Sequence, residues 1–448
     1  MPDDLTTCQP GPPDHGAGLA AEAVTAMSGA RVTPRSASLE GPASWRAAAA
    51  TLAILSFSYG SPLIVVVGLA TMQTDLHTDR SVLALAGALV WVGTGVGGVV
   101  MGRVADRIGM RATACFGTVM MAAGLALSAT GQIWAIYVGH GVLMGLLGNG
   151  AIYPPLVTYI SRWFDRRRGT AIALISSGQY VAGVVWPWLF ERAIARYGWR
   201  ATMLGFAVII LVAILPLALW LLAPPPEAVA PIARARRGTV APRRAQVLGM
   251  RSGTAQALLC VAGFCCCVPM AIPAAHLVAY CGDLGFGAAQ GAAMFSLLLG
   301  CAFVSRQFWG LFADRYGGLR TVMTGSALQA AAICAFLLTR SEVGLFVVSA
   351  AFGLGFSGII PAYVVAIRDL FPSAEASWRV PLMLLTAMGG MAFGSWFAGV
   401  LYDQFGYYAP AFASGVLFNL ANLSVIGFLV ARQGKSGRRH GTAMLAAE

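Results

Sequence analysis

Length and composition exclude a soluble protein. The chain has 448 residues, of which 58% are hydrophobic and only 11% are charged, whereas soluble domains carry about 25% charged residues to cover a water-facing surface. The formal net charge is +12, but the arginines lie between apolar runs without interleaved aromatic residues, so they do not indicate nucleic-acid binding. The composition predicts an all-α protein that crosses a membrane many times.

The chain divides into two tails, a linker and two sets of spans. Residues 1–45 hold prolines, acids and small residues without an apolar core, which predicts a disordered tail and not a signal peptide. Twelve later stretches reach the roughly 20 apolar residues that a spanning helix needs. These predicted spans are 47–72, 81–101, 112–130, 133–160, 169–190, 199–223, 253–280, 288–309, 321–339, 342–368, 376–402 and 407–431. The predicted units are the tail 1–45, a six-helix bundle at 46–223, a linker at 224–252, a second bundle at 253–431 and a tail at 432–448.

The basic residues predict the orientation. If both termini and the even-numbered loops share one side, that side holds 24 basic residues and the odd-numbered loops hold 5. The remaining one, Arg306, lies inside the eighth span. Cytoplasmic loops carry the excess of lysine and arginine. We therefore predict that both termini and the linker are cytoplasmic and that the protein is a multi-pass protein of the cell (inner) membrane.

A shift of 208 residues superposes the two halves of the sequence. It places Asp75-Leu76 on Asp283-Leu284, Gly102 on Gly310, Ala105-Asp106-Arg107 on Ala313-Asp314-Arg315, and Gly109 on Gly317. A parallel duplication of six spans is the architecture of many secondary transporters, in which the substrate binds between the halves near mid-membrane.

The repeated segment GRVADRIGMR, from Gly102 to Arg111, resembles the loop signature of the major facilitator superfamily, and GLFADRYGG repeats it. The resemblance implies a gating motif. Its expected residues are Gly102, Asp106, Arg107, Gly109 and Arg111 in the first copy, and Gly310, Asp314 and Arg315 in the second. The glycines at the helix ends are expected to permit close backbone approach. The first copy has the fuller basic complement, so Asp106 is expected to control the gate more strongly than Asp314.

Within that superfamily the chain is most similar to the monocarboxylate transporters and their bacterial relatives. The similarity rests on Glu40-Gly41 with Trp45, Phe57-Ser58-Tyr59 with Pro62, Trp163-Phe164 with Arg166-Arg167-Arg168, His276-Leu277-Val278, and Arg306 with Gly310. It implies that Arg306 binds a substrate carboxylate. Leu63 and Ala302 stand where the animal lactate carriers have a lysine and an aspartate. The choice between a coupling proton and a counter-substrate therefore stays open.

Arg306 is the sharpest candidate for the substrate site. A charge at the bilayer centre costs about 2.5–3.5 kcal/mol on insertion scales, so such a residue normally faces a cavity, with snorkelling to the interface as the alternative. No acid lies in the middle third of a predicted span, which disfavours a cation and favours an anionic small-molecule substrate. The remaining candidates are polar residues within spans, for which interhelical hydrogen bonding is the alternative: His276, Tyr59, Tyr153, Asn149, Gln179 and Tyr363.

These features predict a secondary active transporter that moves a small organic anion, in particular a monocarboxylate, by alternating access. The sequence shows no phosphate-binding loop, metal-ligand spacing or nucleophile elbow, so neither a cofactor nor an enzyme activity is expected. The expected partners are the lipid bilayer, the anionic substrate, and a coupling proton or counter-substrate. Two alternatives are a carrier for another small molecule, in vitamin uptake or in drug or metabolite efflux, and a transporter-like sensor.

Overall fold

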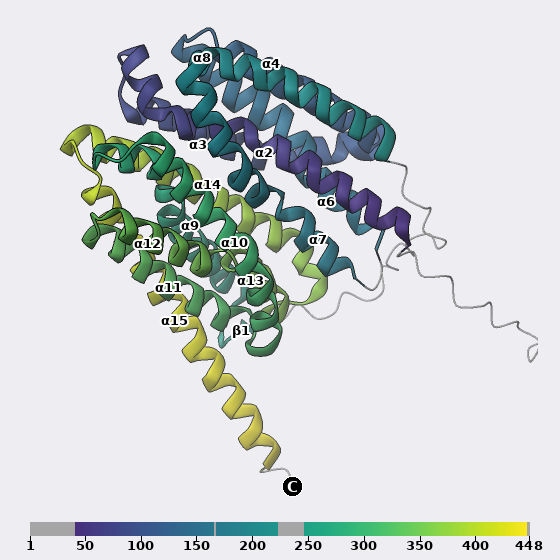
Figure 1. Cartoon of the computed structure of the whole chain (residues 1–448). Coiled ribbons are helices and arrows are strands. Elements are labelled where there is room, and N and C mark those ends of the chain that lie inside the picture. Colours follow the sequence, from purple (N-terminus) through teal and green to yellow (C-terminus); the bar gives the residue numbers. More distant parts are fainter. Residues whose placement is uncertain (1–40, 165–166, 223–245, 446–448) are drawn as a thin grey trace, which may run out of the picture.

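The computed structural model describes residues 41–164, 167–222 and 246–445. The N-terminal half, purple through blue to teal in Figure 1, consists of helices joined by short turns. Its elements are α2 (Pro42–Leu76), α3 (Arg80–Ile108), α4 (Met110–Ser128), α5 (Ile133–Tyr137), the π-helical segment η1 (Val138–Asn149), α6 (Gly150–Ser161), α7 (Arg168–Ser176), α8 (Gly178–Pro216) and the π-helical segment η2 (Leu217–Leu221).

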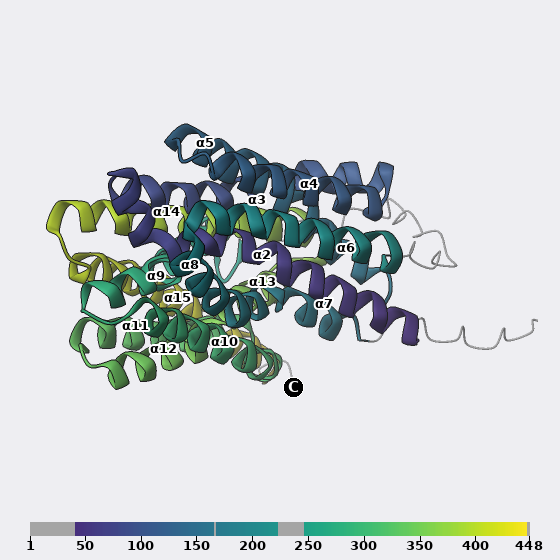
Figure 2. The same cartoon turned by 45° about the horizontal axis from the view of Figure 1, so that its top comes forward.

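The C-terminal half, green to yellow, lies alongside the N-terminal half in both views (Figures 1 and 2). It opens with a short antiparallel hairpin and continues as helices. Its elements are β1 (Gln246–Val247), β2 (Met250–Arg251), α9 (Ser252–Asp283), α10 (Ala288–Tyr316), α11 (Gly318–Leu338), α12 (Glu342–Phe356), α13 (Ile359–Leu370), α14 (Ser373–Phe405) and α15 (Ala409–Leu445).

The helices account for all twelve predicted spans. Eleven helical stretches in the described residues are long and apolar enough to cross a membrane. One of them, Thr170–Leu221, has 52 residues, far more than one crossing needs. It is interrupted at Gly198, whose φ of 79° and ψ of 163° are not helical, so it contains the fifth and the sixth predicted spans. The chain is an all-α membrane protein, as its composition predicted.

The 208-residue shift also relates the helix bounds of the two halves. α3 and α10 have 29 residues each, and both their starts and their ends differ by 208. Each is followed by a glycine in the left-handed region, Gly109 with φ 86° and Gly317 with φ 83°. An L residue with a side chain is strained there, so these glycines permit the sharp turn into the next helix.

Two close helix crossings hold the halves together. α8 meets α10 at Gly183, where an added Cβ would overlap Leu299. α14 meets α3 at Gly399, where a Cβ would lie 2.7 Å from the Cα of Ser81. Small residues let membrane helices approach closely and gain van der Waals contact. These crossings position the side chains that lie between the halves.

The ends of the predicted units differ in detail from the described helices. Residues 1–40 and 223–245, which include most of the predicted N-terminal tail and linker, lie outside the described residues. α2 begins at Pro42, within the predicted tail, and residues 246–251 of the predicted linker form the hairpin. α15 continues through the predicted C-terminal tail to Leu445. The predicted unit boundaries stay predictions.

Candidate functional site

Arg306 of the C-terminal half contacts Tyr180 of the N-terminal half, and two further tyrosines of that half continue from this contact. Its guanidinium carbon is 5.2 Å from the ring centroid of Tyr180 on α8, within cation–π range. Tyr59 of α2 interacts electrostatically with Arg306 and with Tyr180. Its ring packs edge-on against that of Tyr153 on α6, with centroids 5.7 Å apart. We call these four residues the Arg306 cluster. The structure thus brings together three predicted site residues, Arg306, Tyr59 and Tyr153, and adds Tyr180.

The guanidinium of Arg306 has no counter-ion within the described residues. None of their ion pairs or hydrogen bonds involves it. Arg306 lies ten residues before the end of α10, which at 1.5 Å per residue is about 15 Å along the helix. Its contact with Tyr180 directs the side chain toward the opposite half, which favours a binding role over snorkelling to the interface.

Three other predicted residues are placed differently. Asn149 is buried and accepts a hydrogen bond from Ser58 within the N-terminal half. Tyr363 is fully buried and donates to the side-chain oxygen of Asn422 at 2.6 Å within the C-terminal half. Both side chains therefore form hydrogen bonds between helices of one half, which was the alternative to a role in the substrate site. Gln179 precedes Tyr180 and is half-buried.

A second polar group joins the halves at the end of the bundle where α3 begins. The Nη1 and Nη2 groups of Arg80 donate to the two carboxylate oxygens of Asp283, at the end of α9, at 2.6 and 2.7 Å. The guanidinium carbon lies 3.7 Å from the ring centroid of Tyr402 on α14. The Arg80 side chain is 6% exposed and that of Asp283 is 30% exposed. Because the pair is bidentate and poorly solvated, removing one partner leaves the other charge uncompensated and costs free energy.

Asp403 of α14 completes this contact by capping α3. Its carboxylate oxygens accept hydrogen bonds from the backbone N–H groups of Arg80 at 3.0 Å and of Ser81 at 2.9 Å. The first N–H groups of a helix have no partner within the helix, and the helix dipole favours a negative charge there. The start of α3 is therefore bound on one side by α9 and on the other by α14.

His276, a predicted site residue, belongs to this contact and not to the Arg306 cluster. The hydroxyl of Tyr408 accepts from Arg80 Nη1 at 3.0 Å and lies 3.0 Å from His276 Nδ1. His276 Nε2 lies 2.8 Å from the carbonyl oxygen of Ser395. His276 and Tyr408 are both buried. We define the Arg80 junction by these residues: Arg80, His276, Asp283, Tyr402, Asp403 and Tyr408.

The equivalent acid of the first half is paired within its own half. Asp75 is related to Asp283 by the 208-residue shift and accepts a hydrogen bond from Arg200 at 2.5 Å. These two side chains are 43% and 46% exposed. The position of Arg200 is occupied by Tyr408 in the second half. After the duplication, the acid at this position therefore binds Arg80 of the opposite half instead of a neighbour.

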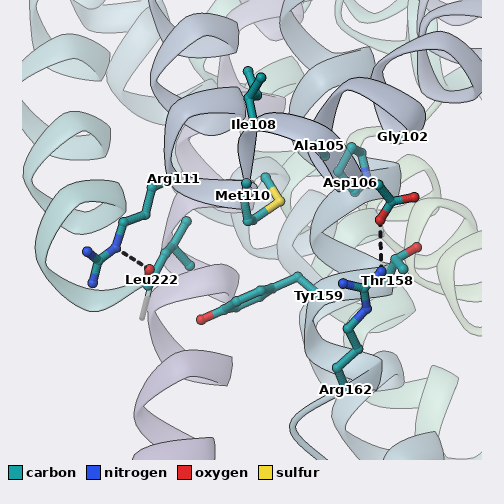
Figure 3. A pocket seen from close by; sticks show the side chains of 12 residues that line it. Gly102, Ala105, Asp106, Ile108, Met110, Arg111, Thr158, Tyr159, Arg162 and Leu222 are labelled. Atoms are coloured by element: carbon teal, nitrogen blue, oxygen red, sulfur yellow. Dashed lines mark hydrogen bonds and ion pairs between the residues drawn. The ribbon is translucent and has the colours of Figure 1, made fainter. Parts of the chain in front are cut away.

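A pocket of about 470 Å³ lies beside the first copy of the loop signature (Figure 3). Asp106 accepts a hydrogen bond from Arg162 of the same half at 2.8 Å, and Arg111 donates to the backbone oxygen of Leu222. The ring of Tyr159 lies between these two contacts in Figure 3. The ion-paired side chains are 62% and 54% exposed, so the pair contributes at most about 1 kcal/mol to stability.

The second copy of the signature is arranged differently. Within the described residues Asp314 forms no ion pair, and the backbone N–H of Gly318 donates to Asp369 at 3.1 Å instead. Arg107 and Arg315 are exposed. That Asp106 controls the gate more strongly than Asp314 stays a prediction.

The glycines of the signature have two different roles. Gly109 and Gly317 provide the left-handed turns described above. The close backbone approach expected at Gly102 and Gly310 is not found, because a Cβ added at either position would meet nothing within 4 Å. That expectation is wrong for the arrangement described here.

The sequence interpretation overlooked the Arg80 junction. In the sequence, Arg80 stands out only as one of the few basic residues of the odd-numbered loops. The match of Asp75 to Asp283 was a usable signal, since it marks an acid at the equivalent helix end of each half. Tyr180 could be anticipated only as one polar residue among several within the fifth span.

The sequence profile of the Major Facilitator Superfamily matches residues 47–306 and 257–444. The chain belongs to this superfamily. The two matches together cover both halves, in agreement with the duplication. The chain is therefore a membrane transporter protein by family and by fold.

Its relatives differ in what their names say they carry. The chain is 25% identical to the MFS-type transporter pynF of Aspergillus niger over 81% of its length and 83% of the relative. It is 24% identical to the Agnestins efflux protein AgnL12 of Paecilomyces divaricatus, over 73% of each chain. It is also 24% identical to Monocarboxylate transporter 13 of Bos taurus, over 72% and 74%. The crystal structure of a mutant of the nucleoside transporter NupG shares the fold, with a TM-score of 0.66 at 13% identity over 87% and 99% of the two chains.

Proposed function

We propose that this transporter moves a small organic anion, in particular a monocarboxylate, by alternating access. The observation that carries this proposal is Arg306, which lies between the halves without a counter-ion in the described part of the chain. A carboxylate would neutralise the guanidinium and satisfy two of its N–H donors at once.

The tyrosines of the Arg306 cluster suit the remainder of such a substrate. Their rings offer an apolar surface, and each hydroxyl adds a hydrogen-bond donor or acceptor. Tyr59, Tyr153 and Tyr180 come from three different helices of the N-terminal half, whereas Arg306 comes from the other half. A substrate bound to all four would contact both halves, as a site that alternates between two openings requires.

The orientation of the chain in the membrane and the partners of transport are part of the same proposal. The arginine distribution supports both termini on the cytoplasmic side of the cell membrane. A coupling proton or a counter-substrate would supply the driving force.

Efflux of a larger metabolite is the second candidate function. It is favoured by the similarity to an efflux protein of Paecilomyces divaricatus. Such a substrate would use the aromatic faces of the cluster more than the charge of Arg306. Vitamin uptake and a transporter-like sensor are further alternatives.

The substrate class can be tested on purified protein in proteoliposomes. Small monocarboxylates and dicarboxylates should be compared with their neutral amides, both in uptake and in thermal-shift assays. We expect monocarboxylates to be taken up and to raise the melting temperature, whereas the amides do neither. Equal binding of acid and amide would contradict an anion site, and binding without uptake would indicate a sensor.

The signature loop provides a separate prediction. Replacing Asp106 with asparagine removes its ion pair with Arg162. An exposed pair is worth at most about 1 kcal/mol, so we expect transport to slow by about fivefold while substrate affinity changes little. The matched control is Asp314→Asn, which removes an acid without an ion pair in the described residues and should have a smaller effect. Equal rates for both variants and the unmodified protein would refute a gating role.

A further inference from the structure

Hydrogen-bond polarity in the Arg80 junction favours one protonation state of His276. Because a guanidinium can only donate, the hydroxyl of Tyr408 accepts from Arg80 Nη1 and directs its own hydrogen toward His276 Nδ1. Because a carbonyl can only accept, His276 Nε2 donates to the oxygen of Ser395. The arrangement that gives every one of these donors an acceptor therefore has a neutral imidazole with its hydrogen on Nε2.

A second proton on this ring is incompatible with the junction. An Nδ1–H group would face the hydroxyl of Tyr408, which would then receive hydrogen bonds from both sides while its own hydrogen lost its acceptor. Two cations, His276 and Arg80, would flank a single buried hydroxyl. His276 is fully buried and Tyr408 is 2% exposed, so water cannot compensate either the charge or the unmade hydrogen bond.

The neighbouring groups do not relieve this conflict. Asp283 is engaged by Arg80 in a bidentate pair. Asp403, the acid on α14, interacts electrostatically with the ring, but its two oxygens already accept from the backbone at the start of α3.

Two tyrosines complete the surroundings of His276. Tyr280, one helical turn further along α9, donates to the carbonyl oxygen of Phe336. Tyr402 lies under the guanidinium of Arg80. Within the described residues the ring of His276 is hydrogen-bonded only to Tyr408 and Ser395, so a proton added at Nδ1 meets the hydroxyl of Tyr408 and no carboxylate.

We propose that His276 is a proton-binding site that controls the Arg80 junction: a proton on Nδ1 favours the state in which the halves separate at this end. A solvent proton forms the N–H bond when the junction is open and returns to solvent when the junction closes, and no other covalent bond forms or breaks. This inference goes beyond the proposed substrate site and does not depend on what Arg306 binds. It gives the carrier a direct route from proton binding to the opening of one end.

The backbone amides of Arg80 and Ser81 provide the readout. Both are hydrogen-bonded to Asp403 across the halves, so their hydrogen exchange reports separation of the halves at this end. The full-length protein in lipid nanodiscs, without substrate, should be followed by exchange mass spectrometry between about pH 5 and pH 8, where histidine titrates. Exchange must be corrected for its intrinsic pH dependence with an unstructured reference peptide.

We expect corrected exchange at the start of α3 to rise several-fold on acidification, within the limit of about tenfold per pH unit that one proton sets. His276→Gln should abolish the rise, because the amide can accept from Tyr408 and donate to Ser395 but does not titrate. The matched control is His140→Gln, since His140 is likewise fully buried among the described residues and contacts Ser128 in the N-terminal half. This control should respond to pH as the unmodified protein does.

Three outcomes would overturn the proposal: no pH response in the unmodified protein, an unchanged response in His276→Gln, or loss of the response in His140→Gln as well. If His276→Gln exchanges fast at every pH, Tyr408→Phe decides, because it keeps the ring but removes the hydroxyl that links His276 to Arg80. A weakened pH response in Tyr408→Phe supports the proposal, and a full response refutes it.

Discussion

Replacing Arg306 with alanine should abolish binding and uptake of the organic anion. Each charge-assisted hydrogen bond to a carboxylate is worth about 1.5–3 kcal/mol, and the guanidinium can provide two in parallel. The loss therefore exceeds a hundredfold in affinity, at about 1.4 kcal/mol per factor of ten. Arg306→Lys should retain part of the affinity, because the positive charge stays while the planar fork is lost.

Two control variants separate substrate binding from general damage. Tyr180→Phe keeps the ring next to the Arg306 guanidinium and should change affinity only a few-fold. Arg192→Ala removes an exposed arginine whose guanidinium carbon lies 3.9 Å from the ring centroid of Trp188. Like Arg306→Ala it removes a cation–π contact, but outside the Arg306 cluster. Isothermal titration with a monocarboxylate and uptake into proteoliposomes provide the measurements. Normal transport by Arg306→Ala would contradict an anion site at Arg306 and would indicate another substrate class.

The positions of the helices could be predicted from hydropathy because a bilayer sets the length of an apolar helix. The one merged helix shows the limit of this argument: Gly198 departs from helical geometry without ending the helical stretch. The sequence does contain this signal, since the same 208-residue shift relates Gly198 to Gly406, where α14 ends.

The candidate site could be predicted only in part, because hydropathy does not tell which face of a helix meets which neighbour. Arg306 was recognisable because an unpaired charge in a membrane span is costly. Tyr363 and Asn149 carry polar groups of the same kind as Tyr59, but their partners lie within one half. His276 was predicted as a substrate-site residue, whereas its partner Tyr408, 132 residues away, places it in the Arg80 junction. Such contacts depend on how the two halves pack.

Breaking the ion pair of the Arg80 junction should have the second large effect. Arg80→Ala leaves the carboxylate of Asp283 without its partner and removes the contact with the ring of Tyr402. Removing one partner of a buried pair costs about 3–5 kcal/mol. Asp283 is partly exposed and gains water when the halves separate, so only part of this cost, about 1–3 kcal/mol, should favour the open end over the closed end. The equilibrium constant for opening should then rise roughly 5- to 150-fold.

A carrier that cannot close this end cannot complete its cycle, so transport by Arg80→Ala should fall by about fivefold or more. Hydrogen exchange at the start of α3 should rise at neutral pH. Arg200→Ala is the matched control, because it unpairs the equivalent acid, Asp75, within one half where both side chains are nearly half exposed. It should cost no more than about 1 kcal/mol and leave exchange at α3 unchanged.

Exchanging the two charges tests whether the pair itself holds the halves together. Asp283→Arg alone places two cations against each other and should impair transport severely. Combining it with Arg80→Asp restores an attractive pair in reverse order, although the bonds to Tyr402 and Tyr408 are lost, so transport should recover in part. If the double variant is no better than the single one while both fold, as judged by thermal unfolding, the charge pair does not hold this end closed. If Arg80→Ala transports at the normal rate with unchanged exchange, the junction is only a packing contact, because opening it would then cost nothing in the transport cycle.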